Sequence, residues 1–162
     1  LHYFSHPNCK QMTVLELGSC RGDTTRVLAE CFGKVISFER DAENVAAALE
    51  LNQECSNVSI TQADVYSDEF TLPDEKIDVA FIDAGHTTEL VLRDINRVSE
   101  KYGKVIYIFD DFGQMDEVVT KAIYQAQSEG KLNISRFIGA NAGFVTANGK
   151  KFKTAEGVIC NI

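Results

Sequence analysis

The sequence lacks any apolar run approaching the roughly 18–20 residues that a membrane-spanning helix needs. Its opening residues also lack the basic leader and apolar stretch of a signal peptide. We therefore expect a cytoplasmic protein that makes no membrane contact. The first residue is Leu rather than Met, which is consistent with a domain cut from a longer polypeptide.

Basic side chains are scarce as well: 16 Lys and Arg stand against 24 Asp and Glu, for a formal charge of −8. Nucleic-acid binding relies on neutralising phosphates, so this balance argues against a nucleic-acid partner. The five cysteines are odd in number and include no Cys-x-x-Cys pair, which argues against a disulfide framework and a zinc site. With 44% hydrophobic and 25% charged residues, the 162-residue chain is expected to form a single globular domain, 1–162.

What the sequence does have is a regular alternation of apolar runs and amphipathic segments. Strands are predicted at 13–17, 34–38, 58–62, 77–82 and 104–109, and helices at 23–32, after Asp41, at 88–102 and at 115–126 before Gly130. Asp23 or Thr24 is the predicted cap of the first helix. The predicted core-facing side of the second helix consists of Val45, Ala48, Leu49 and Asn52.

The end of the chain has a different character. Short strands are predicted at 134–138, 143–147 and 151–154, with Asn148-Gly149 as a hairpin turn. Repeated strand–helix alternation predicts a Rossmann-like, doubly wound α/β sheet that is mostly parallel. The final strands are expected to form an antiparallel edge.

Acidic residues follow five successive predicted strands. The strand ends carry, in order, Glu16 with Gly18, Glu39, Asp64, Asp83 with His86, and Asp110-Asp111. In open α/β sheets, ligands bind beyond the carboxyl ends of the strands. Each of these residues alone has an ordinary explanation as a turn, a cap or a hydrogen-bonded structural residue. Together they predict a ligand site on one rim of the sheet.

The loop after the first strand, ELGSCRGD, restricts the choice of ligand. Its two glycines are four apart, which does not fit the Gly-x-Gly-x-x-Gly dinucleotide fingerprint. Acids at both ends of the loop suit a ligand that carries an amine and no phosphate. At the next strand end, Glu39 can accept hydrogen bonds from the vicinal hydroxyls of a ribose. Asp64 is placed to accept one from the amino group of adenine.

At these residues the sequence resembles a known family. ELGSCRGDTT, VISFERD, QADV and VAFIDAGH are similar to motifs of class I S-adenosylmethionine-dependent methyltransferases, over roughly residues 13–112. The resemblance implies a seven-stranded sheet whose last strand is antiparallel. Cys20 stands where many members have a glycine. The implied cofactor-binding residues are Glu16, Gly18, Ser19, Cys20, Gly22 and Thr24 in the first loop and helix, Glu39 and Arg40 at the ribose, Asp64 and Val65 at the adenine, and Asp83.

Two later stretches, FIDAGHTTELVLRDI and VIYIFDDFG, resemble a branch of small-molecule O-methyltransferases that includes divalent-metal enzymes acting on sugar hydroxyls. The resemblance implies that Asp83, Asp110 and Asp111 hold the metal, Mg²⁺ or another divalent cation. Carboxylates gathered at adjacent strand ends would otherwise repel one another. Asp83 and His86 are the implied catalytic residues. The third family position is Gly85 rather than an acid, so the division of roles between Asp83 and His86 stays open.

The predicted function is therefore O-methylation of a small molecule, with a sugar or glycan end as the favoured acceptor. The parent polypeptide could then be a multidomain protein that also builds the glycan. Four alternatives remain open at this point: a metal-free methyltransferase with His86 as its base, a catechol-like acceptor, an NAD(P)-dependent oxidoreductase and a catalytically silent binding module.

Overall fold

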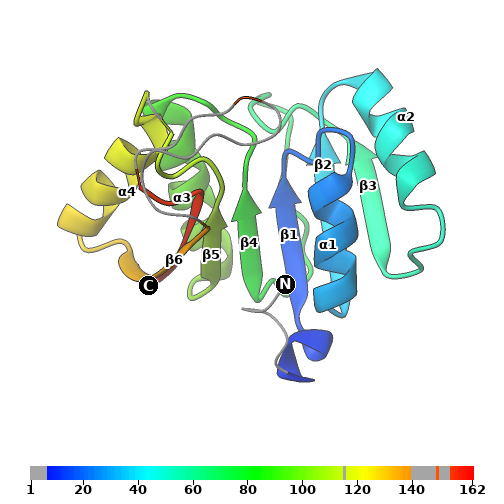
Figure 1. The fold of residues 1–162 in the computed structure, drawn as a ribbon, viewed down its shortest axis with the longest axis horizontal. Helices are drawn as coiled ribbons and strands as arrows, with labels where there is room; N and C mark the ends of the chain where they lie inside the picture. Colours follow the sequence, from blue (N-terminus) through cyan, green and yellow to red (C-terminus); the bar gives the residue numbers. More distant parts are fainter. Residues whose placement is uncertain (1–6, 115, 140–148, 150–153) are drawn as a thin grey trace. The chain divides into compact units, whose positions relative to one another are not determined.

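The computed structural model describes residues 7–114, 116–139, 149 and 154–162. The seven strands form one sheet in the order β3-β2-β1-β4-β5-β7-β6. This order and the antiparallel pairings at its end confirm the predicted Rossmann-like architecture. The elements of Figure 1 are, in chain order, a short 3-10 helix (Pro7–Gln11), β1 (Thr13–Leu17), α1 (Asp23–Cys31), β2 (Lys34–Glu39), α2 (Ala42–Leu51), β3 (Val58–Gln62), β4 (Val79–Ile82), α3 (Thr88–Tyr102), β5 (Ile106–Phe109), α4 (Val118–Ser128), β6 (Asn133–Ile138) and β7 (Gly157–Asn161).

The chain divides into two compact units, Leu1–Ala84 and Gly85–Ile162. In the first unit β1 pairs in parallel with β2 and with β4, and β2 pairs in parallel with β3. The arrowheads of β1 and β4 accordingly lie at the same end in Figure 1. Parallel pairing brings the loops that follow these four strands to one edge of the unit. In the second unit β7 pairs antiparallel with β5 and with β6.

Strand β1 lies in the core of the first unit. Val14, Leu15 and Glu16 are 0% exposed and Leu17 is 1% exposed, so both faces of the strand are covered. A strand buried on both faces is expected to be continuously apolar. Glu16 breaks that rule, and a carboxylate held inside a core needs a specific reason to be there.

The helix boundaries correct two of the predictions for the first unit. The N-cap of α1 is Gly22, in a left-handed conformation, rather than Asp23 or Thr24. The predicted cap of α2 is confirmed, because Asp41 accepts hydrogen bonds from the two backbone N–H groups of Glu43 and Asn44. On α2, Val45, Ala48 and Asn52 are buried as predicted, but Leu49 is 50% exposed.

The remaining differences concern strand and helix ends. Strand β4 begins at Val79, two residues later than predicted. The side chain of the preceding residue, Asp78, accepts a hydrogen bond from the Thr13 N–H at 3.0 Å. Helix α4 begins at Val118 rather than at 115. Strand β7 was not predicted from the sequence. The predicted strands 143–147 and 151–154 fall almost wholly outside the described residues. No helix within the described ranges is long and apolar enough to cross a membrane.

Candidate active site

The loop between β1 and α1 makes a close backbone turn that requires glycine at both ends. Gly18 has φ +90° and Gly22 has φ +88°. A Cβ at Gly18 would lie 2.7 Å from the Asp83 carbonyl oxygen and 2.8 Å from Ala84 Cα. Left-handed geometry and this close approach both favour a residue without a side chain. The loop therefore lies directly against the backbone that follows β4.

Glu16 ties three elements of the first unit together. Its Oε2 accepts hydrogen bonds from Thr25 Oγ1 of α1 and Ser37 Oγ of β2, both at 2.6 Å. Its Oε1 is buried and has no hydrogen-bond partner in the described part of the chain. Burial raises the pKa of Glu16 from 4.5 to about 7, against the two hydroxyl donors that lower it, and the nearby charge of Glu39 raises it further.

The two hydroxyl partners of Glu16 were missed by the sequence analysis. Thr24 was predicted to bind the cofactor, whereas the buried threonine of the pair is Thr25, at 0% exposure. Helical periodicity could have identified it, because Thr25 precedes the buried Leu28 by three residues and so shares its face. Ser37 lies inside a short apolar strand run, which indicates burial, but a hydroxyl there gives no sign of its partner.

We expect Glu16 to make the folded protein less stable as the pH rises. Unfolded, Glu16 ionises near pH 4.5; folded, it keeps its proton until about pH 7. The folded state therefore binds more protons between these values, and the free energy of unfolding falls as pH increases through that window. The difference corresponds to about 3 kcal/mol.

Urea unfolding of the wild type and of Glu16→Gln, from about pH 4 to about pH 8, measures this effect. The wild type should lose about 3 kcal/mol relative to the variant across that range. Parallel pH profiles for the two proteins would contradict the assignment.

Glu39, the last residue of β2, binds the backbone of the loop between Gly18 and Gly22. Its Oε2 accepts a hydrogen bond from the Cys20 N–H at 2.9 Å, and its Oε1 accepts one from the Asp41 N–H at 2.8 Å. Cys20 has φ +46°, a left-handed conformation that costs energy for a residue with a side chain. The Glu39 carboxylate therefore fixes the loop in a strained geometry at the position where many members of the resembled family have glycine.

Asp64 and Val65 follow β3 on the neighbouring strand. The Ala63 N–H donates to the Glu39 carbonyl at 2.8 Å, which brings this turn beside the end of β2. Asp64 is exposed and accepts a hydrogen bond from the Tyr66 N–H at 2.9 Å, while Val65 is buried. The structure thus gathers the predicted ribose and adenine residues at adjacent strand ends of one unit. Arg40, also predicted there, is exposed.

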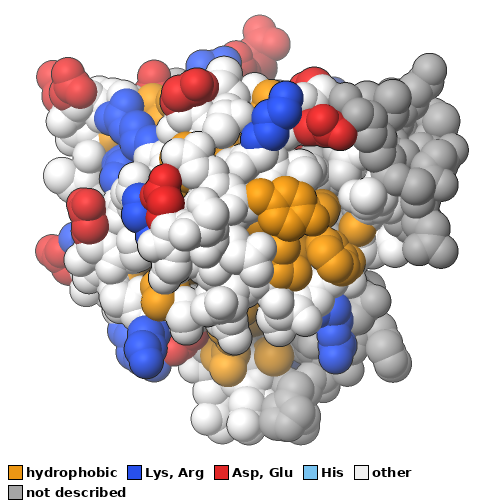
Figure 2. All heavy atoms as spheres, turned by 90° about the vertical axis from the view of Figure 1, so that its left-hand side faces the viewer, with side chains coloured by type: hydrophobic (Ala, Val, Ile, Leu, Met, Phe, Trp, Pro, Cys, Tyr) orange, Lys and Arg blue, Asp and Glu red, His pale blue; other side chains and the backbone are white. Residues whose placement is uncertain are grey.

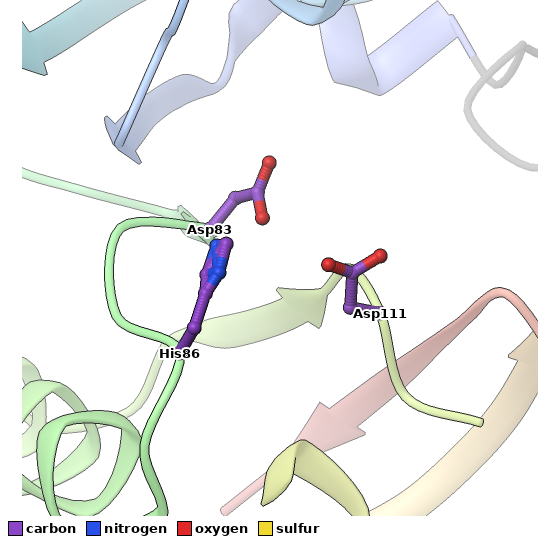
Figure 3. A group of neighbouring side chains, drawn as sticks. All are labelled: Asp83, His86 and Asp111. Atoms are coloured by element: carbon purple, nitrogen blue, oxygen red, sulfur yellow. The ribbon is translucent and has the colours of Figure 1, made fainter. Parts of the chain in front are cut away.

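Asp83, His86 and Asp111 each offer a possible metal ligand, with ligand atoms all within 4.8 Å of one another. Asp83 and His86 are three residues apart in one short loop, and Figure 3 shows them with Asp111. His86 is exposed and Asp111 is 5% exposed. Asp110, which the sequence analysis placed among the metal ligands, is not in this group, whereas His86 is.

Asp111 is held in a conformation that it would not adopt without support. Its φ is +56°, in the left-handed region. The next two N–H groups donate to backbone carbonyls just before β7, from Phe112 to Glu156 at 2.9 Å and from Gly113 to Ala155 at 2.8 Å. Backbone strain of this kind persists where the surrounding structure over-determines it, and such positions cluster at functional sites.

Aromatic packing adds to that support. The ring of Phe112, at 1% exposure, lies 6.0 Å from the ring of Tyr124 and 5.4 Å from that of Phe137. Tyr124 and Phe137 are 51% and 48% exposed. Figure 2 views the molecule from the left-hand side of Figure 1, where α4 lies, and shows apolar side chains gathered on that surface. The residue after Asp111 is therefore anchored by the aromatic residues of α4 and β6.

Comparison with known proteins gives one family and a set of structural neighbours. Residues 15–112 match the model of a family described as "Methyltransferase domain". No curated protein is significantly similar to the sequence. An O-methyltransferase from Bacillus cereus, solved in complex with S-adenosylhomocysteine, aligns with a TM-score of 0.64 at 15% identity over 93% of this chain and 73% of that one.

Two further solved structures are similar. A S-adenosylmethionine-dependent methyltransferase from Aquifex aeolicus has a TM-score of 0.61 at 20% identity, over 93% of this chain and 82% of its own. A tRNA methyltransferase from the same organism has a TM-score of 0.66 at 19% identity, over 94% of this chain and 62% of its own. At these identities the three neighbours establish the fold alone, whereas the family match covers more than half of the chain.

Proposed function

Because this chain belongs to the methyltransferase-domain family, we propose that it transfers a methyl group from S-adenosylmethionine to a hydroxyl of a small molecule, with a divalent cation at the acceptor. We favour a sugar or a glycan end as that acceptor. The observation that carries the proposal is the grouping of Asp83, His86 and Asp111 next to a glycine loop whose Gly18 approaches the Asp83 carbonyl. The loop offers a cofactor site, and the group offers the means to activate a hydroxyl.

The cofactor assignment is supported by the polar groups at the strand ends of the first unit. Glu39 is already oriented by two backbone N–H donors, which leaves lone pairs for two ribose hydroxyls. Asp64 is exposed beside it and can accept from an adenine amino group. The loop from Gly18 to Gly22 would surround the methionine part. No phosphate site is needed, which matches the glycine spacing.

The donor set fits a divalent cation. Asp83 and Asp111 supply the hard carboxylate oxygens that Mg²⁺ or Mn²⁺ prefers, and His86 can act either as a third ligand or as a base. When bound there, the cation would supply Lewis acidity that lowers the pKa of an acceptor hydroxyl. A sugar hydroxyl is very weakly acidic and benefits most from such help, which is why we favour it over a catechol.

The residues themselves carry the rest of the mechanism. Asp83 is positioned by β4, and Asp111 by the turn after β5, so the acceptor oxygen can be held in one orientation for in-line attack on the methyl carbon. His86 or Asp83 accepts the hydroxyl proton as the oxygen attacks. The bond from sulfur to the methyl carbon breaks as the new bond forms, and S-adenosylhomocysteine leaves.

Other acceptors and reactions have less support. The tRNA methyltransferase among the neighbours raises the case of a nucleic-acid acceptor, but a formal charge of −8 is unfavourable for phosphate contacts. An NAD(P)-dependent oxidoreductase has no support from the family match. A silent binding module would bind the cofactor and transfer no methyl group.

Calorimetric titration and a transfer assay test the proposal. We expect micromolar binding of S-adenosylmethionine with or without Mg²⁺, and no binding of NAD, since the fingerprint for its pyrophosphate is missing. Labelled methyl groups should then pass to glycosides only when Mg²⁺ or Mn²⁺ is present. Binding of NAD alone would contradict the cofactor, transfer that ignores chelators would contradict the metal, and transfer to catechols alone would contradict the sugar.

A further inference from the structure

One polar side chain outside the predicted site contacts the cofactor loop directly. Asn52, the residue that ends α2, is 4% exposed. Its Nδ2 donates to the Gly22 carbonyl at 3.1 Å and to the Ala48 carbonyl at 2.9 Å. Two carbonyl acceptors require two donors, which an amide nitrogen has and a carboxylate lacks.

Gly22 is the residue on which the cofactor loop depends. Its N–H donates to the Ser19 carbonyl at 2.9 Å, which closes the turn from Ser19 to Gly22, and its own carbonyl accepts the Arg26 N–H at 3.0 Å at the start of α1. No side chain caps that helix start. Asn52 reaches from another helix to the same carbonyl and thereby holds both the turn and the beginning of α1.

The packing around this contact leaves no room for adjustment. A Cβ at Gly22 would lie 2.6 Å from Asn52 Nδ2 and 2.8 Å from Ala48 Cα. Ala48 is 0% exposed. The amide and Ala48 of α2 therefore both lie against Gly22, and the left-handed conformation of Gly22 is supported from outside the loop.

We propose that Asn52 is a positioning residue for the cofactor: it holds Gly22, and with it the Ser19–Gly22 turn, in the geometry that receives the methionine part of the cofactor. This inference rests on the proposed function, because its readout is cofactor binding. A loop that is already ordered pays less conformational entropy when the ligand binds. Loss of the two donors should therefore weaken the cofactor, while the chemical step, carried by residues elsewhere, changes little.

The chain offers a matched control: Asn52 contacts the beginning of α1, and a second asparagine contacts its end. Asn57 Nδ2 donates to the Ala29 and Phe32 carbonyls, both at 3.0 Å, at the C-terminal end of α1. Asn57→Asp thus removes the same two amide donors from the other end of α1, away from the cofactor loop. Both substitutions should lower the melting temperature, so stability alone does not distinguish them.

The experiment compares Asn52→Asp with Asn57→Asp in calorimetric titration with S-adenosylhomocysteine, below both melting temperatures. We expect Asn52→Asp to raise the dissociation constant at least about tenfold, and Asn57→Asp to stay within about twofold of the wild type. Partial unfolding lowers the number of binding sites rather than their affinity. In steady-state kinetics, KM for S-adenosylmethionine should rise with Asn52→Asp while kcat stays within about threefold.

Each outcome decides the matter. Equal affinity for Asn52→Asp and the wild type, or an equal loss with Asn57→Asp, would overturn the positioning role and leave the proposed function intact. A folded wild type that does not bind S-adenosylhomocysteine would overturn both. If Asn52→Asp does not fold, the milder pair Asn52→Ser and Asn57→Ser replaces it, with the same expected difference in direction.

Discussion

Replacing Asp111 by Asn should lower kcat for methyl transfer at least about 100-fold and leave the affinity for S-adenosylhomocysteine nearly unchanged. The variant keeps the size of the side chain but replaces a charged oxygen of the Asp83, His86 and Asp111 group with a neutral amide. The cation would then have one charged ligand fewer. Asp111 is not among the predicted cofactor residues, so cofactor binding provides an internal control.

The neighbouring residue gives the sharpest comparison for this prediction. Asp110→Asn should cost less than Asp111→Asn, because Asp110 is not part of the group. Chelation with EDTA should reproduce the loss seen with Asp111→Asn, and Mn²⁺ or Mg²⁺ should restore the wild type. Equal losses for the two variants would favour the ligand set implied by the sequence resemblance. Full activity of Asp111→Asn in EDTA would instead point to a metal-free enzyme with His86 as its base.

Gly18→Ala should destabilise the protein by about 3–5 kcal/mol and abolish cofactor binding. The added Cβ must adopt φ +90° and would lie 2.7 Å from the Asp83 carbonyl oxygen. The left-handed conformation contributes about 1–2 kcal/mol of that loss. Forcing the backbone apart contributes the remainder, and it displaces the loop where the methionine part would bind.

Gly130→Ala is the matched control for the steric part of that loss. Gly130 follows α4 at φ +71°, and a Cβ there would meet nothing within 4 Å. The Gly130 N–H donates to the Gln127 carbonyl at 3.0 Å and the Lys131 N–H to the Ala126 carbonyl at 2.9 Å, the closure that is typical of a left-handed residue after a helix. The substitution should therefore cost only the conformational share, about 1–2 kcal/mol, and leave cofactor binding unchanged. Urea unfolding and calorimetric titration of both variants measure the difference. A Gly18→Ala protein as stable as Gly130→Ala would show that the loop can move away from β4.

Much of the fold could be read from local patterns. The runs of β1, β2 and β3 were predicted to within one residue, because each is a short run rich in apolar and β-branched residues that is bounded by turn residues. Strand β6 was also found. Strand β7 was missed because its pattern, Gly157 to Asn161, resembles any short apolar stretch, and its place between β5 and β6 depends on pairing with distant segments.

The candidate site shows the same division. That Glu16, Glu39, Asp64 and Asp83 would lie toward one edge of the first unit followed from their places at the ends of parallel strands. The sequence did not indicate that Glu16 is enclosed by hydroxyls of α1 and β2, because a carboxylate in a sequence reveals neither its burial nor its donors. It equally gave no reason to choose Asn52, which lies 30 residues from Gly22 along the chain.

The sequence by itself determined which residue types stand at the strand ends, and from them it predicted a Rossmann-like sheet and a polar ligand site beyond its strands. Hydrophobic periodicity and glycine positions are local properties, so one chain is enough to read them. Tertiary structure alone decided which oxygen and nitrogen atoms come within reach of one another. Within the second unit, Asp111 has a left-handed conformation, and the two N–H groups after it donate to the Glu156 and Ala155 carbonyls, contacts between segments that lie far apart in the sequence.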